Sequence, residues 1–115
     1  MAARRRIAGL AVLLVLISGG AGTLRAQETD RARAQALAVE GNRAYESGDY
    51  AAAAADYRAA LDGGLHSAVI HYNLGNALFK QGELGEAVVA YERALRLDPR
   101  DEAARANLAR GSRRR

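Results

Sequence analysis

Apolar residues recur at spacings of three and four along the chain from Thr29 onward, which is the pattern of helices that bury one face. In this part of the chain, no stretch alternates apolar and polar residues strictly enough to predict a strand. Short runs that contain Gly or Pro interrupt the pattern. It therefore predicts an all-α fold with five helices, over residues 29–46, 50–62, 67–81, 84–97 and 101–110.

Local signals set the expected ends of these helices. Thr29 or Asp30 is suited to cap the first helix, because a short polar side chain accepts a hydrogen bond from a free backbone N–H group. Gly48 and Gly82 are expected to end the helices before them in the left-handed conformation. Gly111 is expected to end the last helix.

The chain repeats itself. Seven residues between positions 41 and 61 recur 34 positions later, as Gly75, Asn76, Gly82, Ala87, Tyr91, Ala94 and Leu95. Self-similarity at this period is typical of stacked helix pairs. Gly41 and Gly75 fall inside helices, where Gly costs about 1 kcal/mol relative to Ala, so a neighbouring helix is expected to approach them closely. Tyr57 and Tyr91 are expected to fill the space between successive pairs.

One stretch of the second copy resembles the tetratricopeptide repeat: Asn73-Leu74-Gly75-Asn76-Ala77, followed by Gly82, Ala87, Tyr91, Ala94 and Pro99. The resemblance implies a right-handed α-α superhelix of antiparallel helix pairs. The implied segments are a lead-in at residues 27–33, repeats at 34–67 and 68–101, a closing helix at 102–110 and a basic tail at 111–115. In the first copy Glu40 and Ala44 replace Leu74 and Leu78, so its core is expected to be thinner.

A narrower resemblance covers more of the chain. A signal-like start, the run from Gly41 to Tyr50, the run from Tyr72 to Asn76 and the ending from Pro99 to Leu108 resemble the repeat protein encoded in bacterial aerotolerance (Bat) operons. This resemblance implies a component of an envelope stress or aerotolerance complex.

Residues 1–26 have the layout of a secretory signal peptide, with a basic start, an apolar run over residues 7–17 and an exit of small residues before a cut after Ala26. The alternative is an uncleaved membrane anchor, although a spanning helix normally needs about 20 apolar residues. The first interpretation predicts a periplasmic or secreted protein. The second predicts a protein anchored in the membrane.

The formal net charge of +4 comes from the N-terminal segment. Removal of residues 1–26 removes four of the 17 basic residues and none of the 13 acidic ones, which leaves 13 of each. A neutral domain does not favour nucleic acid as a partner. The alternative is weak binding of an anionic membrane or nucleic acid through the basic tail, whose three arginines are otherwise expected to stay solvated.

In the resembling family the first helix of each pair lines a concave groove, which gives the candidate binding residues. They are Asn42, Tyr45, Tyr72, Asn73, Asn76, Phe79, Lys80 and Asn107. Asn amides carry donors and an acceptor that suit an extended peptide backbone, and the aromatic residues offer contact area. The alternative is that the amides join helix to helix and that the aromatic residues pack against the next helix.

Charge in this groove is expected to be sparse. Repeat domains that capture a C-terminal carboxylate place Lys and Arg where this chain has Ala38, Ala103 and Asn107. A clamp for a charged chain terminus is therefore not expected, and Lys80 is predicted to be the only cation in the groove.

Catalysis is not predicted. The chain has no Cys, and His66 and His71 are too isolated to indicate a metal site or a general base, so neither a metal nor a cofactor is expected. The sequence predicts a non-enzymatic module of the bacterial cell envelope that binds a protein partner, either as a peptide segment or as a partner helix in the groove. Because the core is small, the protein is expected to be marginally stable alone and to gain from self-association or from that partner.

Overall fold

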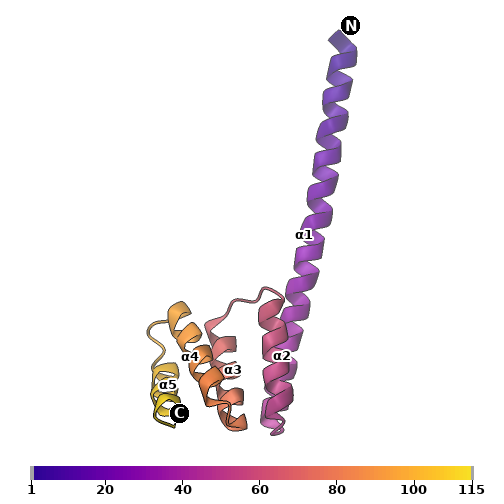
Figure 1. Cartoon of the computed structure of the whole chain (residues 1–115). Helices are drawn as coiled ribbons and strands as arrows, with labels where there is room; N and C mark the ends of the chain where they lie inside the picture. The colour runs from indigo at the N-terminus through magenta and orange to yellow at the C-terminus, as the bar shows by residue number, and fades with distance from the viewer. Residues whose placement is uncertain (1, 115) are drawn as a thin grey trace. The chain divides into compact units, whose positions relative to one another are not determined.

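The computed structural model describes the backbone of residues 2–114 and the side chains of residues 21–114. The described backbone contains α helices and no strand (Figure 1), which confirms the all-α prediction. The helices are α1 (Ala2–Glu46), α2 (Tyr50–Asp62), α3 (Ala68–Gln81), α4 (Leu84–Leu97) and α5 (Glu102–Arg114). The chain divides into two units, residues 1–30 and residues 31–115, and the second unit contains the helix pairs.

The predicted start of the first helix is wrong, because α1 is continuous through Thr29 and Asp30. The hydroxyl of Thr29 donates a hydrogen bond of 2.9 Å to the carbonyl of Arg25, one turn earlier, and so joins an existing helix. Residues 21–29 contain no Pro and include Ala, Leu, Arg, Gln and Glu, which favour helix. Most of the predicted signal peptide lies in residues 1–20, whose side chains are outside the described part. Where side chains are described, no helix is long and apolar enough to span a membrane.

Glycine turns end α1 and α3, as predicted. Gly48 and Gly82 have φ angles of 82° and 80°, in the left-handed region that Gly adopts without strain. The backbone N–H groups of Asp49 and Glu83, which follow the two glycines, return to helix carbonyls at 2.9 Å. The same turn therefore joins the helices of both pairs.

A tyrosine from the second helix of each pair packs against a glycine of the first. A Cβ on Gly75 would lie 2.6 Å from Cε1 of Tyr91, and a Cβ on Gly41 would lie 2.8 Å from Cε1 of Tyr57. The two tyrosine side chains are the largest fully buried ones. The predicted close approach to the glycines is confirmed. The prediction that the tyrosines lie between successive pairs is corrected, because each ring fills the space inside its own pair.

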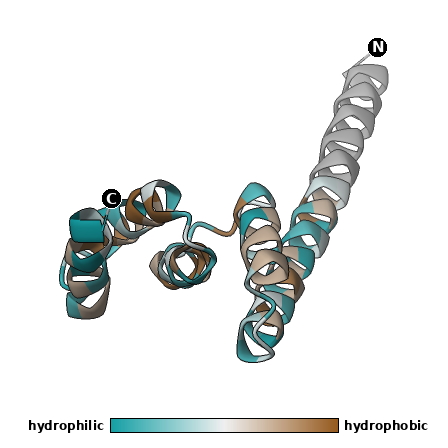
Figure 2. Ribbon diagram, turned by 60° about the horizontal axis from the view of Figure 1, so that its bottom comes forward, coloured by the Kyte–Doolittle hydropathy of each residue, from teal (hydrophilic) through white to brown (hydrophobic). Residues whose placement is uncertain are grey.

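The core is made mostly of alanine around these two tyrosines, and the helices that form it carry both apolar and polar residues (Figure 2). Leu74 and Leu78 are buried in the second pair. At the matching positions of the first pair, Glu40 is exposed and Ala44 is only partly buried, as the thinner core predicted. Glu40 pairs with Arg43 in solvent, which is how the outer face of a terminal repeat stays soluble.

Helix α5 is longer than predicted and runs to Arg114. Gly111 is not among the glycines with positive φ, and it does not end the helix. It is buried, and a Cβ there would lie 3.2 Å from Cγ2 of Val88 in α4. Gly111 therefore allows α5 to pack closely on α4, which is a reason for glycine inside a helix that the sequence pattern did not reveal.

Candidate functional site

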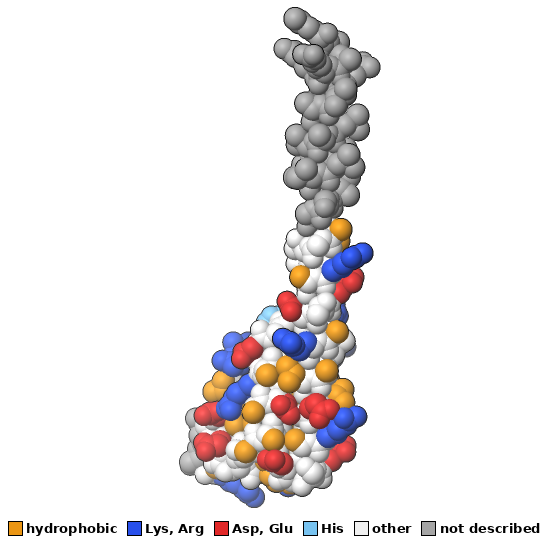
Figure 3. Space-filling model, turned by 90° about the vertical axis from the view of Figure 1, so that its right-hand side faces the viewer, with side chains coloured by type: hydrophobic (Ala, Val, Ile, Leu, Met, Phe, Trp, Pro, Cys, Tyr) orange, Lys and Arg blue, Asp and Glu red, His pale blue; other side chains and the backbone are white. Residues whose placement is uncertain are grey.

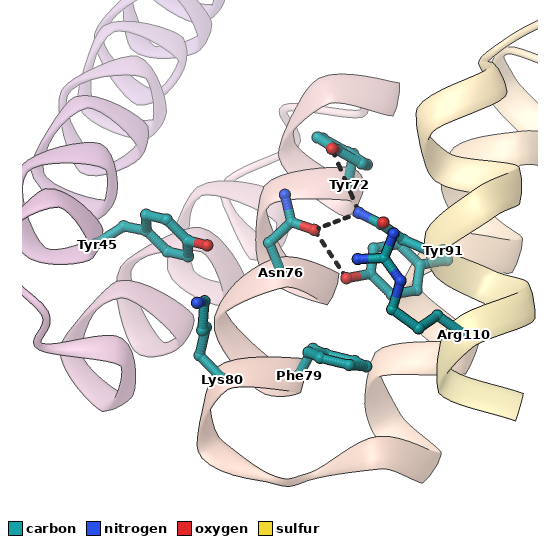
Figure 4. Close-up of a pocket in the computed structure, with 8 residues that line it drawn as sticks. Tyr45, Tyr72, Asn76, Phe79, Lys80, Tyr91 and Arg110 are labelled. Atoms are coloured by element: carbon teal, nitrogen blue, oxygen red, sulfur yellow. Dashed lines mark hydrogen bonds between the residues drawn. The ribbon is translucent and has the colours of Figure 1, made fainter. Parts of the chain in front are cut away.

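Two neighbouring pockets form a groove along helices α1, α3 and α5 of the second unit. The α3–α5 pocket has a volume of about 260 Å³ and is lined by Tyr45, Tyr72, Asn76, Phe79, Lys80, Tyr91, Asn107 and Arg110 (Figure 4). The α1–α3 pocket has a volume of about 170 Å³ and is lined by Asn42, Tyr45, Glu46, Tyr57, Asn73 and Asn76. The pockets share Tyr45 and Asn76, so they are parts of one groove.

Every residue predicted for the site lines one of these two pockets. Asn42 and Asn73 lie in the α1–α3 pocket, and Tyr45 and Asn76 lie in both. The others lie in the α3–α5 pocket, namely Tyr72, Phe79, Lys80 and Asn107. The prediction missed Glu46, Tyr57, Tyr91 and Arg110 as lining residues.

In the α1–α3 pocket, one amide oxygen accepts two hydrogen bonds. The hydroxyl of Tyr57 donates to Oδ1 of Asn42 at 2.6 Å. Nδ2 of Asn73, in the next helix pair, donates to the same oxygen at 3.3 Å. Asn42 thus joins its own pair to the following one through a single atom.

The same arrangement recurs 34 residues later in the α3–α5 pocket. The hydroxyl of Tyr91 donates to Oδ1 of Asn76 at 2.7 Å, and Nδ2 of Asn107 donates to that oxygen at 3.0 Å. Nδ2 of Asn107 also donates to the hydroxyl of Tyr72 at 3.3 Å. Figure 4 shows these bonds converging beside Asn76. The alternative that the amides join helix to helix is therefore confirmed: Asn42 and Asn76 do so through Oδ1, and Asn73 and Asn107 through Nδ2.

The bonded oxygens decide which atoms of the groove are left for a ligand. Both acceptor positions of Oδ1 are used in Asn42 and in Asn76. Neither Nδ2 group makes a hydrogen bond to the described residues. The two asparagines therefore offer N–H donors to the groove.

The tyrosine hydroxyls keep their protons in this network. Burial raises the pKa of Tyr91 well above its ordinary value of 10.0, and Tyr72 and Tyr45 add to the rise. Burial likewise raises the pKa of Tyr57. At neutral pH both hydroxyls remain donors, so the asparagine oxygens stay occupied.

The groove holds more positive charge than predicted. Arg110 of α5 lines the α3–α5 pocket with Lys80, so Lys80 is not the only cation there. The guanidinium of Arg114 lies 5.3 Å from the ring centre of Phe79, and Nζ of Lys80 lies 5.9 Å from that of Tyr50. Arg110 stands 34 residues after Asn76, so continuing the repeat by one more step would have found it.

The histidines lie away from the groove. His66 and His71 line a separate pocket with Arg58 and Arg93. Nδ1 of His71 is buried without a hydrogen-bond partner, and burial, followed by the charge of Arg93, lowers the pKa of His71. Among the side chains of residues 21–114, no group of three His, Cys, Asp or Glu side chains is placed to hold a metal.

Comparison with known families identifies the second helix pair. Residues 68–101 match the model of the tetratricopeptide repeat family. That stretch contains α3, α4 and the packing of Tyr91 against Gly75. The second helix pair is therefore similar to one tetratricopeptide repeat.

The solved structures that match the chain include two TPR domains. The NMR structure of the first TPR domain of the human RPAP3 protein is 21% identical, with a TM-score of 0.42 over 72% of this chain and 92% of that chain. The first TPR of Spaghetti (RPAP3) bound to the HSP90 peptide SRMEEVD is 23% identical, with a TM-score of 0.35 over 70% and 91% of the two chains. No curated protein gave a match to the sequence.

Proposed function

We propose that this protein is a non-enzymatic interaction module that holds an extended peptide segment of a partner protein in the groove. The observation that carries the proposal is the pair of amide groups, on Asn42 and Asn76, that line the groove, whose oxygens are bonded inside the protein and whose N–H groups have no acceptor among the described residues. Donors in this position suit a ligand that presents acceptors.

The donors favour an extended segment over a partner helix. A helix uses its backbone carbonyls internally, so it offers few acceptors along its side. An extended segment carries free carbonyls along its length, and these can pair with the amides whatever its side chains are. The rings of Tyr45, Tyr72 and Phe79 line the same groove and offer apolar contact between those hydrogen bonds.

We further propose that the protein acts in the bacterial cell envelope. The proposal is supported by the layout of residues 1–26 as a signal peptide. The mass of the protein recovered from the periplasm of an expressing bacterium tests it. A chain that begins at Gln27 supports export with cleavage, an intact chain in the membrane fraction supports the anchor, and an intact cytosolic chain contradicts both. A role in an envelope stress or aerotolerance complex, which the resemblance to the aerotolerance-operon protein implies, stays a prediction.

Selection from a random ten-residue peptide library tests the groove. The full chain is compared with a variant that carries both Asn42→Asp and Asn76→Asp. Aspartate keeps the oxygen that accepts from tyrosine and from the next asparagine, and it removes the N–H donors. Binding of selected peptides is expected to weaken by about tenfold or more, because two hydrogen bonds are lost.

A matched control changes amide to acid outside the groove. Gln35→Glu makes the same chemical change at an exposed residue that lines neither pocket. It is expected to bind the selected peptides like the unmodified chain. If the double variant also binds them unchanged while its helix content is retained, the groove is not the binding site.

A further inference from the structure

The two ends of the groove carry opposite charges. Lys80 and Arg110 line the α3–α5 pocket, and none of the residues that line it is acidic. Glu46 lines the α1–α3 pocket, which has no cation in its lining. The same position of successive first helices changes from acidic to basic along the repeat, and it is occupied by Glu46, Lys80 and Arg114.

The two cations are not neutralised within the described part of the chain. The ion pairs formed there are those of Arg43 with Glu40 and of Arg58 with Glu86, and neither involves a groove residue. Nζ of Lys80 rests near the ring of Tyr50, and the side chain remains exposed, as does that of Arg110. Both charges are therefore available to a ligand.

Uncharged donors stand beside these cations. Nδ2 of Asn76 lines the same pocket and has no acceptor among the described residues. A carboxylate accepts several hydrogen bonds at once and carries the opposite charge to Lys80 and Arg110. The pocket thus matches a carboxylate in charge and in hydrogen bonding.

We propose that the α3–α5 pocket is a carboxylate subsite, in which Lys80 and Arg110 hold an acidic group of the bound peptide segment. The proposal rests on the proposed function and adds a direction to it. The acidic part of the segment lies toward α5, and Glu46 repels an acidic residue from the other end. Repeat domains that capture a C-terminal carboxylate carry their cations at the positions of Ala38, Ala103 and Asn107, which differ from those of Lys80 and Arg110.

The same peptide library tests the subsite separately from the groove. The full chain is expected to enrich peptides with an Asp or Glu toward one end, and the variant with Lys80→Gln and Arg110→Gln is expected to enrich peptides without that preference. No enrichment with either protein would overturn the proposed function and the subsite together. Peptides without acidic preference on the unmodified chain overturn the subsite alone.

A chemical property of the chain gives a sharper test, because Lys80 is its only lysine. A carbodiimide joins an amine directly to a carboxylate in contact with it, so coupling at position 80 reports a carboxylate in this pocket. The most enriched library peptide is synthesised in three forms. The first has its Glu and an amidated end, the second has Gln and an amidated end, and the third has Gln and a free C-terminal carboxylate.

Coupling of the first form to Lys80, mapped by mass spectrometry, supports a side-chain carboxylate as the occupant. Coupling of the third form assigns the subsite to a chain terminus. If neither form couples at Lys80 although the peptide binds, the subsite is absent. Lys80→Arg is expected to abolish coupling and to preserve binding, because the charge remains and the amine is lost.

Arg113→Gln is the control for general attraction to the basic tail, since Arg113 is exposed on the same helix and lines neither pocket. Replacement of both Lys80 and Arg110 by Gln is expected to weaken binding of the Glu form by roughly tenfold and to leave the Gln forms nearly unchanged, since exposed ion pairs act on selectivity more than on affinity. An equal loss on Arg113→Gln would mean that net charge, and no defined subsite, attracts the peptide.

Discussion

The hydroxyl of Tyr91 donates a 2.7 Å hydrogen bond to Oδ1 of Asn76 while its ring fills the space left by Gly75. The side chain of Tyr91 therefore acts at two levels. Its ring holds α4 against α3, and its hydroxyl fixes the orientation of a groove amide. The pair of Tyr57 and Asn42 does the same in the first repeat.

Removal of the Tyr91 hydroxyl is expected to destabilise the protein without disturbing the ring packing. Tyr91→Phe should lower the free energy of unfolding by about 1–2 kcal/mol, because Asn76 loses a buried hydrogen-bond donor. Urea unfolding followed by circular dichroism measures the change. Tyr50→Phe is the control, since no hydrogen bond joins the Tyr50 hydroxyl to a described residue, and it is expected to change stability little. Equal losses in both variants would contradict the role of this bond.

A methyl group at position 75 is expected to be harmful even though alanine favours helix. Gly75→Ala places a Cβ 2.6 Å from the Tyr91 ring, and overpacking of this kind typically costs about 1–3 kcal/mol. Gly85→Ala is the matched control in α4, where a Cβ would meet nothing within 4 Å. That change is expected to stabilise the protein by about 0.5–1 kcal/mol. The two variants should shift the urea midpoint in opposite directions, and a shift in the same direction would contradict the packing.

Stability is expected to fall on acidification because of His71. Burial lowers its pKa in the folded state below the ordinary value of 6.5, and the charges of Arg93, His66 and Arg96 lower it further. The folded state therefore binds the proton less well than the unfolded state does. The contribution of neutral His71 is fully present above pH 6.5, and it decreases as the pH falls from 6.5 toward the lowered folded-state pKa.

Urea unfolding at several pH values between 7.5 and 5 measures this dependence, with the range set by the ordinary pKa of histidine. His71→Leu is expected to flatten the slope. His66→Gln should leave most of it, since His66 is exposed. A slope that survives in His71→Leu would assign the acid sensitivity to other groups.

The purified protein is expected to be marginally stable, and self-association is expected to raise its melting temperature. The second unit has a core in which most of the buried residues are alanine, and such a small core gives little margin. Thermal melts should have midpoints below about 65 °C that rise with protein concentration. A cooperative melt that is independent of concentration and lies above that temperature would contradict this expectation.

The repeat and its turns were predictable from sequence because they depend on local chemistry. Gly48 and Gly82 end their helices through φ angles that few other residues adopt, and the 34-residue period placed Asn42 and Asn76 in equivalent positions. The resemblance to the tetratricopeptide repeat implied that the predicted groove residues share one surface. Their side chains are close together because the first helices of successive repeats are neighbours.

Other features depend on partners that a sequence pattern does not show. Gly111 lies inside α5, where a Cβ would come close to Val88, and Thr29 lies inside α1, where its hydroxyl donates to the carbonyl of Arg25. In Asn76, for example, the oxygen is occupied and the N–H group is free of acceptors in the described part of the chain because Tyr91 and Asn107 both donate to the oxygen. Arg110 was missed because the last helix was expected to end there.

One face of the described surface carries charges of both signs. On the side drawn in Figure 3, Lys and Arg side chains are interspersed with Asp and Glu and with apolar residues. A surface of mixed sign does not draw polyanions over long distances. Short-range contacts inside the two pockets then decide which ligands bind.

The doubly bonded asparagine oxygens also bear on the speed of recognition. Rotating either amide by half a turn would break two hydrogen bonds at once, so the N–H donors are held in their binding orientation before any ligand arrives. The entropy of ordering them is lost during folding rather than during association. The proposed partner segment would therefore bind to donors that need no rearrangement.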